Sequence, residues 1–456
     1  MAVPASVMTH MTDNAHRTLV VGLGKTGLSV ARYLSRQGVE VAVVDSREQP
    51  PGLVAMREAL PADVALFLGG FDEVAFARAD RIVVSPGVSV HEPQIAAAAA
   101  RGVPVIGDVE LFARAASAPV IAITGSNGKS TVTMLVSAMA QRAGKDVRTG
   151  GNIGTPALDL LQDVEPDLYV LELSSFQLET THSLRAAAAV VLNISADHMD
   201  RYPHLDAYSR AKQTIYRNAG VQVVNRDDLQ ASALSDPGHP GITYTTQEPV
   251  EATGFGVIDY HGEPWLAQGA QPVMPVADIR MPGRHNVSNA LAALALGSVA
   301  GLDQQAMVAT LAEFRGLPHR MQPVAERDGV HWFNDSKGTN VGATLAAINS
   351  VDGKVVLIAG GDAKGADLTP LRDAMQRQGR AAVLIGKDAP RLQQVLQDVV
   401  PLAMSPDMAD AVRQAGELAR SGDSVLLSPA CASTDMYRNF EERGEIFSQA
   451  VRELLS

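Results

Sequence analysis

The sequence contains one cysteine, no excess of positive charge and no long hydrophobic run. Because Cys431 has no second cysteine to pair with, an intrachain disulfide is excluded and a reducing compartment is expected. The formal net charge of −12 argues against a general binder of nucleic acid or of membrane surfaces, since both require a basic face. No stretch approaches the roughly 18 apolar residues that span a bilayer, and residues 1–17 lack the apolar segment of a secretory signal. We therefore expect a cytoplasmic protein whose first 17 residues form a loose tail.

Apolar runs typical of buried strands alternate with helical patterns along most of the 456 residues. These runs lie at 18–24, 39–45, 81–86, 119–125, 168–173, 189–194, 221–225, 354–361, 381–386 and 423–429. Their alternation with helices predicts an α/β protein with parallel sheets that are covered on both faces. Residues 241–282 break the pattern and predict a small β insertion made of short hairpins.

Glycine-rich turns divide this α/β pattern into three parts, which agrees with a rough prior of about 150 residues per domain. The predicted domains are 1–107, 108–316 and 317–456. We expect a Rossmann-like N-terminal domain, a central P-loop ATPase-like domain that carries the β insertion, and a Rossmann-like C-terminal domain.

The first glycine-rich loop, VVGLGKTGLS at 20–29, has the spacing of a dinucleotide-binding loop. Gly22, Gly24 and Gly27 permit a tight turn and a close approach of the backbone to a phosphate at a helix N-terminus. Asp45 ends the next strand, where an acidic residue would meet a ribose hydroxyl. This loop alone is compatible with three interpretations: a site for NAD or NADP, a site for another nucleotide or phosphate ligand, and a purely structural turn.

The second loop, PVIAITGSNGKST at 119–131, is a more specific signal. A strand leads into Gly125, Gly128 and Lys129, and a helical pattern follows, which is the plan of a P-loop. Ser130 or Thr131 would offer a hydroxyl to Mg²⁺. The general pattern would place its first glycine at position 123, which is isoleucine here. The loop predicts an ATP site, which a NAD-dependent oxidoreductase does not need.

Two residues at strand ends are candidates for a metal bound beside this nucleotide. Glu172 ends the run LYVLE, and His198 follows the run AVVLNI, so both would face the edge of the sheet that carries the P-loop. The structural alternative is that Glu172 caps a helix and that Asp197 or Asp200 begins the next one.

Eight motifs in order resemble those of the Mur ligases across essentially the whole chain. They are TGSNGKST, GGNIG, LELSSFQLE, NISADHMDRY, GRHNVSNALAALA, GLPHRM, NDSKGTN and LLSPACASTD. The resemblance implies an ATP-dependent amide-bond-forming ligase of cytoplasmic peptidoglycan synthesis that uses Mg²⁺. Its implied substrates are UDP-N-acetylmuramoyl-L-alanine, which is activated as an acyl phosphate, and D-glutamate. We expect a monomer without nucleic-acid or membrane partners.

The resemblance also assigns the three domains to the UDP-substrate, to ATP and to the amino acid, in this order. The implied catalytic residues are Lys129, His198, Lys212 and Lys337, and Ser130, Glu172, His198 and a carbamylated Lys212 are the implied metal ligands. The implied ATP-binding residues are Gly125, Ser126, Asn127, Gly128, Lys129, Ser130, Thr131, Asn289, Arg320 and Asp335. The implied UDP-substrate residues are Gly24, Lys25, Thr26, Asp45, Ser46, Arg47, Ser85, Gly87 and Asn152. The implied D-glutamate residues are Thr339, Lys364, Ser433 and Phe440.

Three features qualify this interpretation. From the residues alone, Lys212 is predicted to be an exposed lysine on a helix, because lysines are mostly on surfaces. Lys25 stands where the family pattern has an aliphatic residue, and Thr434 stands where it has leucine. A related ligase with another amino acid or a folate-type substrate, and a nucleotide-binding protein that has lost catalysis, are the alternatives.

Overall fold

The computed structural model describes residues 17–61, 64–281, 283 and 285–455. The chain separates into two compact units. Unit 1 comprises Met1–Ser117, Gly150–Glu165 and Phe176–Leu184, and unit 2 comprises Ala118–Thr149, Pro166–Ser175 and Arg185–Ser456. Of the predicted N-terminal tail, Arg17 begins strand β1, and residues 1–16 lie outside the described part. The domain limits at 107 and 316 stay predictions.

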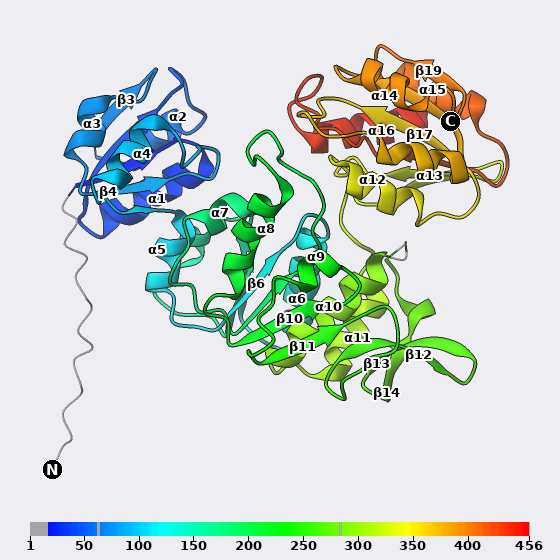
Figure 1. Ribbon diagram of the computed structural model, residues 1–456, viewed down its shortest axis with the longest axis horizontal. Helices are drawn as coiled ribbons and strands as arrows, with labels where there is room; N and C mark the ends of the chain where they lie inside the picture. Colours follow the sequence, from blue (N-terminus) through cyan, green and yellow to red (C-terminus); the bar gives the residue numbers. More distant parts are fainter. Residues whose placement is uncertain (1–16, 62–63, 282, 284, 456) are drawn as a thin grey trace. The chain divides into compact units, whose positions relative to one another are not determined.

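The first sheet belongs to unit 1 and has five parallel strands in the order β3-β2-β1-β4-β5 (Figure 1). The strands are β1 (Arg17–Val21), β2 (Glu40–Asp45), β3 (Ala65–Leu68), β4 (Arg81–Val84) and β5 (Val105–Ile106). The helices of this region are α1 (Lys25–Arg36), α2 (Leu53–Ala59), α3 (Glu73–Arg78), α4 (Pro93–Ala100), α5 (Asp108–Ala115), η1 (Ala157–Leu160) and α7 (Ser175–Glu179). Leu19, Val21 and Ile82 lie in its core, which supports the loop between β1 and α1.

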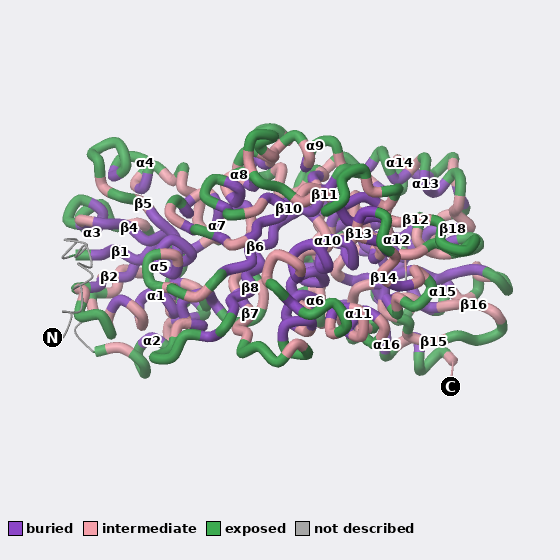
Figure 2. The backbone as a smooth tube through the Cα atoms, turned by 90° about the horizontal axis from the view of Figure 1, so that it is seen from below, coloured by how far each residue is buried: buried purple, intermediate pink, exposed green. Residues whose placement is uncertain are grey.

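The second sheet has nine strands in the order β14-β13-β12-β11-β10-β9-β6-β8-β7. The strands are β6 (Val120–Thr124), β7 (Val147–Gly151), β8 (Leu168–Glu172), β9 (Ala188–Val191), β10 (Val221–Asn225), β11 (Gly241–Tyr244), β12 (Phe255–Tyr260), β13 (Glu263–Gln268) and β14 (Gln271–Pro275). The helices are α6 (Lys129–Arg142), α8 (Leu205–Gln213), η2 (Thr214–Tyr216), α9 (Leu229–Ser232), η3 (Val276–Asp278), α10 (His285–Val299) and α11 (Gln304–Glu313). Buried residues run along β6 and β8 and through α10 (Figure 2), so the ends of these strands are held by a rigid core.

The predicted β insertion is confirmed as hairpins, and the structure adds that they extend this second sheet. β12 pairs antiparallel with β13, and β13 pairs antiparallel with β14 (Figure 1). β11 instead pairs in parallel with β10. β11 also pairs in parallel with β12, so this strand joins the antiparallel hairpins to the rest of the sheet.

The third sheet lies in the C-terminal part of unit 2, in the order β15-β16-β20-β17-β18-β19, and only its β15–β16 pair is antiparallel. The strands are β15 (Gln322–Arg327), β16 (Val330–Asn334), β17 (Val355–Gly360), β18 (Gly379–Ile385), β19 (Leu402–Met404) and β20 (Ser424–Leu427). The helices are α12 (Val341–Ile348), α13 (Pro370–Gln378), α14 (Ala389–Leu396), α15 (Met408–Leu418) and α16 (Phe440–Leu455). Alternate residues of β17 enter two different cores, Leu357 on one face and Ile358 on the other, because successive side chains of a strand point to opposite faces.

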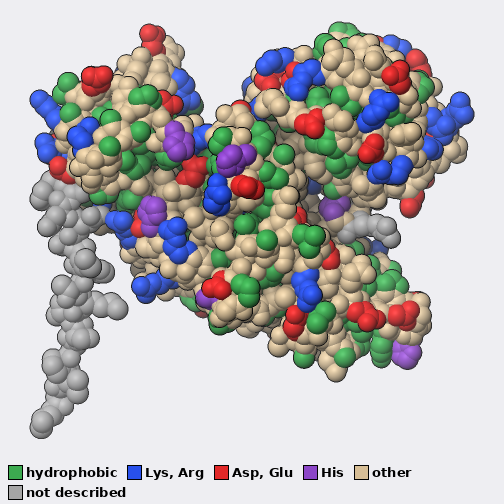
Figure 3. Space-filling model, in the orientation of Figure 1, with side chains coloured by type: hydrophobic (Ala, Val, Ile, Leu, Met, Phe, Trp, Pro, Cys, Tyr) green, Lys and Arg blue, Asp and Glu red, His purple; other side chains and the backbone are tan. Residues whose placement is uncertain are grey.

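All ten predicted buried strands are present, and the predicted α/β class with parallel sheets is confirmed. The sequence pattern missed β3, β5, β7, β15, β16 and β19. Within the described residues, no helix is both long and apolar enough to cross a membrane. On the face that Figure 3 shows, positive and negative side chains are interspersed across the described parts.

Candidate active site

The P-loop connects the end of β6 to the start of α6. Gly125 and Gly128 have φ values of 153° and 82°, which glycine adopts without strain. A Cβ atom on Gly128 would also lie 2.6 Å from Oδ1 of Asn289, so a side chain there would collide with α10. The ammonium of Lys129 donates to the carbonyl oxygens of Gly125 at 2.8 Å and Ser126 at 2.9 Å. The lysine is therefore held at the loop whose backbone amides form the predicted phosphate cradle.

Several cations of unit 2 share one carboxylate, Glu172 at the end of β8. Burial lowers the pKa of Lys129, and Glu172 opposes that shift. The charge of Glu172 likewise raises the pKa of Lys212, Arg320 and Lys337 against the effect of burial. Glu172 thus acts electrostatically on four predicted cations, which come from α6, α8 and the segments that follow α11 and β16.

His198 lies in the loop after β9 in a left-handed conformation with φ 57°. Its Nε2 is 3.8 Å from Oδ2 of Asp197. Burial lowers the pKa of His198, although Asp197 opposes the shift, so the imidazole is neutral and able to offer a lone pair. The N-cap of α8 is His204, which accepts a hydrogen bond from the backbone of Ala207, so neither Asp197 nor Asp200 has that role.

Lys212 is the clearest departure from the residue-based expectation of an exposed lysine, which is wrong. The residue is 1% exposed, and its Nζ lies 3.3 Å from Oγ1 of Thr124 and 4.6 Å from the centroid of the Tyr208 ring. Burial, followed by the charge of Lys129, lowers the pKa of Lys212 well below its ordinary value. A buried neutral amine is a nucleophile, which suits the carbamylation that the resemblance implies.

The predicted metal ligands provide donors that suit a hard cation. Ser130 and Glu172 are buried, and their hydroxyl and carboxylate oxygens are ligands that Mg²⁺ prefers. The Ser130 hydroxyl accepts a hydrogen bond from Nη2 of Arg320 at 2.8 Å. Among the described residues, no three His, Cys, Asp or Glu side chains gather as a metal-binding group. A Mg²⁺ ion here would therefore need oxygens from the nucleotide and from a modified Lys212.

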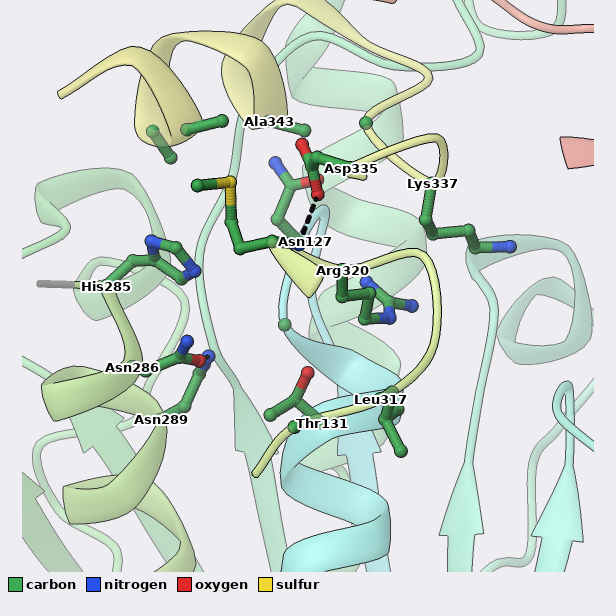
Figure 4. Close-up of a pocket in the computed structure, with 16 residues that line it drawn as sticks. Asn127, Thr131, His285, Asn286, Asn289, Leu317, Arg320, Asp335, Lys337 and Ala343 are labelled. Atoms are coloured by element: carbon green, nitrogen blue, oxygen red, sulfur yellow. Dashed lines mark hydrogen bonds between the residues drawn. The ribbon is translucent and has the colours of Figure 1, made fainter. Parts of the chain in front are cut away.

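A pocket in unit 2 opens beside the P-loop, between α10 and α12 (Figure 4). Six of the predicted ATP residues and one predicted catalytic lysine line it: Asn127, Gly128, Thr131, Asn289, Arg320, Asp335 and Lys337. Its walls also contain Leu317, Ala343 and Ala347, which give the pocket apolar surface. Small-molecule sites combine apolar walls with a few polar groups in this way.

Sequence reasoning missed three polar residues around this pocket. His285 and Asn286 line it from the first turn of α10 (Figure 4), and Nδ2 of Asn289 donates to Oδ1 of Asn286 at 2.8 Å. Asn340 caps α12, and its Nδ2 reaches Oδ2 of Asp197 at 3.1 Å. For Asn286, the one available signal was its position three residues before the predicted Asn289, because residues at this spacing share a helix face.

Three of the predicted D-glutamate residues lie on loops of the C-terminal sheet, and the fourth begins a helix. Thr339 follows β16, and Lys364 follows β17 with φ 48°. Ser433 follows β20, next to Ala432, which pairs with the segment that carries Lys364. Phe440 begins α16, and Nζ of Lys337 is 3.7 Å from its ring centroid. Burial lowers the pKa of Lys337 to about 8.

The predicted UDP-substrate residues all lie in unit 1. Asp45 accepts hydrogen bonds from the Leu23 backbone at 2.7 Å and from the Arg47 guanidinium at 2.7 and 2.8 Å. Burial would raise the pKa of Asp45, but these bonds hold it at about 2. The Ser85 hydroxyl donates to the Gly22 carbonyl at 2.8 Å. Both side chains thus fix the shape of the first glycine-rich loop.

The segment that contains Asn152 is attached to α1, which begins directly after Gly24. Nζ of Lys25 donates to the Gly154 carbonyl at 2.5 Å, and Asp159 accepts hydrogen bonds from Ser29 and Arg32 at 2.7 and 2.9 Å. These residues follow the helical spacing of one face of α1. The remaining predicted positions lie on loops or at the helix start: Thr26, Ser46 and Gly87.

Three family models match the chain in the order of its sheets. They are the Mur ligase MurD-like N-terminal domain at 16–107, the Mur ligase middle domain at 123–297 and the Mur ligase glutamate ligase domain at 319–431. The fold and the pocket beside the P-loop agree with ATP-dependent ligases that form amide bonds, and the chain belongs to the Mur ligase family.

The curated relatives extend over nearly the whole chain. A UDP-N-acetylmuramoylalanine–D-glutamate ligase of Nitrosococcus oceani is 55% identical over 444 residues, which cover 97% of this chain and 98% of the relative. The ligase of the same name from Pseudomonas putida is 54% identical over 437 residues, which cover 95% of this chain and 96% of the relative.

Solved structures share the fold at low identity. The UDP-N-acetylmuramate-alanine ligase of Thermotoga maritima has a TM-score of 0.59 at 18% identity and covers 96% of this chain and 99% of its own. The FolC protein of E. coli has a TM-score of 0.58 at 18% identity, and the match covers 77% of this chain and 94% of the FolC chain.

Proposed function

We propose that this chain is the ATP-dependent ligase that joins the amino group of D-glutamate to the terminal carboxylate of UDP-N-acetylmuramoyl-L-alanine. The observation that carries this proposal is the pocket beside the P-loop, which Arg320 and Lys337 line and at which Lys129 is held by two loop carbonyl groups. Curated relatives with this activity in their names are more than half identical over nearly the whole chain.

The proposed reaction has two steps, a phosphoryl transfer and the formation of the amide bond. A carboxylate oxygen of the UDP-substrate attacks the γ-phosphorus of ATP, the bond to the bridging oxygen breaks, and ADP leaves with that electron pair. The amine of D-glutamate then attacks the carbonyl carbon of the acyl phosphate. The tetrahedral intermediate expels inorganic phosphate, and the amine loses its proton to a base. Both steps bring anions together, so they need concentrated positive charge.

The residues of unit 2 supply that charge. Lys129 would neutralise the β- and γ-phosphates, and Arg320 and Lys337, which line the same pocket, would act on the transferred phosphoryl group. Asn289 and Asp335 line the pocket for the base and the ribose. The positions of Thr339, Lys364, Ser433 and Phe440 support binding of the amino acid by the C-terminal loops.

Mg²⁺ would be held by Ser130 and Glu172, and by His198 with a carbamylated Lys212, where it supplies charge neutralisation of the phosphates. In carbamylation, the neutral amine of Lys212 attacks the carbon of CO₂ and a proton passes to solvent. The burial of the amine supports this step. The product is an anion that can bind a hard cation, which an ammonium cannot.

The first glycine-rich loop of unit 1 would bind the uridine diphosphate rather than NAD. The N-cap of α1 is Gly24, whose lack of a side chain leaves the helix amides to an anion. Lys25, Thr26, Asp45, Ser46, Arg47, Ser85, Gly87 and Asn152 would form the rest of this site. We also propose that the enzyme is a cytoplasmic monomer.

One assay tests the proposal. The protein is incubated with ATP, Mg²⁺ and UDP-N-acetylmuramoyl-L-alanine, and then with D-glutamate, L-glutamate, L-lysine or meso-diaminopimelate, while phosphate release and product mass are measured. We expect release and a new mass with D-glutamate only. A rate of phosphate release with D-glutamate equal to the rate without an amino acid would contradict the proposal. A preference for another amino acid would also contradict it, and would indicate that the departure at Thr434 changes the specificity.

A further inference from the structure

Tyr208 is a buried tyrosine that contacts two parts of the site at once. It lies one helical turn before Lys212 on α8, so both side chains share a face of that helix. The residue is 1% exposed. The ring of Tyr202 meets the Tyr208 ring edge-on with centroids 5.3 Å apart, which restricts the orientation of the latter.

The hydroxyl of Tyr208 is bonded to the P-loop. Its oxygen is 3.1 Å from Oγ of Ser126. The Ser126 hydroxyl has one proton, which it donates to the Ser195 carbonyl at 2.9 Å, and it also accepts from the Ser195 amide at 2.9 Å. Because that proton is already used, Tyr208 is the donor to Ser126. The tyrosine thus joins α8 to the P-loop, and Ser126 joins the P-loop to the loop that contains His198.

The ring of Tyr208 faces Lys212. Nζ of Lys212 is 4.6 Å from the ring centroid, and the one hydrogen bond of this nitrogen within the described residues is to Thr124 at 3.3 Å. A single long hydrogen bond orients a flexible side chain weakly. The ring is therefore the larger contact that fixes the position of Nζ at the end of β6.

We propose that Tyr208 is a positioning residue that aims Lys212 at the nucleotide and couples it to the P-loop. The face of an aromatic ring is negative, so it favours an N–H group and repels a carboxylate. A carbamate on Lys212 would keep its N–H toward Tyr208 and turn its carboxylate away from the ring. This inference rests on the proposed function, because it assigns a role to the modified lysine.

Two substitutions separate the hydroxyl from the ring. Tyr208→Phe keeps the ring and loses the bond to Ser126, so we expect the KM for ATP to rise about fivefold while kcat changes less than about twofold. Tyr208→Leu also loses the ring, and kcat should fall by about 100-fold or more. Ser126→Ala removes the same bond together with the two bonds to Ser195, so its KM for ATP should rise at least as much, and the double variant should be no worse than Ser126→Ala alone.

A spectroscopic measurement reports on Lys212 without turnover. Enzyme equilibrated with ¹³C-labelled bicarbonate should show a carbamate resonance in the wild type and in Tyr208→Phe, and none in Tyr208→Leu or Lys212→Ala. Tyr216→Phe is the matched control, because it removes another buried tyrosine hydroxyl of unit 2, which is bonded to the backbone of Val191 and Val223 and not to the P-loop. It should leave KM for ATP unchanged.

The outcomes distinguish the inference from the proposed function. Absence of ligation by the wild type contradicts the proposed function. A ligating wild type with Tyr208→Leu equal to Tyr208→Phe in kcat and carbamate signal overturns the role of Tyr208. If Tyr208→Leu does not fold, additive effects of Tyr208→Phe and Ser126→Ala, or an unchanged KM in Tyr208→Phe, overturn it instead.

Discussion

Replacement of Asp335 by asparagine should stabilise the protein and weaken nucleotide binding. Asp335 is buried after β16, and its two oxygens accept hydrogen bonds from the Met321 amide at 3.2 Å and the Ser428 hydroxyl at 2.7 Å. Burial raises the pKa of Asp335 from 3.8 to about 7, although these bonds oppose the shift. An asparagine fits the same place, because Ser428 can turn its proton to Thr344, 3.1 Å away, and accept from the new amide.

The size of the stability change follows from linkage. The pKa of Asp335 is higher in the folded than in the unfolded protein, so its stabilising effect is complete below pH 3.8 and is lost as the pH rises through about 7. At about 1.4 kcal/mol per pKa unit, the ionised carboxylate costs at most about 4 kcal/mol. Asparagine does not titrate, so the advantage of Asp335→Asn should be largest above pH 7 and shrink by about 1.4 kcal/mol per pH unit between 7 and 5.5.

Urea unfolding measures this effect. Trp332, which is buried on β16 close to Asp335, reports on the local structure when Trp265 is replaced by phenylalanine. Asp328→Asn is the control, because the Asp328 side chain is 92% exposed, and it should show no such pH dependence. ATP affinity, measured by calorimetry, should fall in Asp335→Asn alone. A variant less stable than the wild type at pH 8, or an advantage that does not change with pH, would refute the reasoning.

Four further changes test other parts of the molecule. Lys129→Ala should abolish phosphate release without lowering the melting temperature by more than a few degrees, as shown by calorimetry. Lys212→Ala should reduce turnover by about 100-fold, with partial recovery when short carboxylic acids are added, because these supply the missing anion. Gly27→Ala should unfold unit 1, by circular dichroism, because its Cβ would lie 1.8 Å from a loop carbonyl oxygen. Lys25→Leu should raise KM for the UDP-substrate several-fold and reduce its salt dependence, whereas Arg36→Leu, at the other end of α1, should not.

Local patterns determined the secondary structure of the buried parts. Continuous apolar runs such as VIAIT of β6 form central strands because both faces of a parallel sheet are covered. The edge strand β19 and the strand β16 escaped prediction, since a partly exposed strand has no continuous apolar run. The P-loop was predicted because its glycines permit the positive φ values of the loop and a lysine that can contact phosphate follows them directly in the sequence.

The sequence by itself determined the α/β class, the ten buried strands and the two phosphate-loop patterns, because these depend on neighbouring residues along the chain. Only the tertiary structure decided that Lys212 is buried beside Tyr208, that Asp335 has a raised pKa, and that the strands between residues 241 and 275 extend the central sheet. Each of these properties depends on the groups that packing brings from distant parts of the chain. Burial and electrostatic coupling are set by spatial neighbours, which a local pattern does not specify.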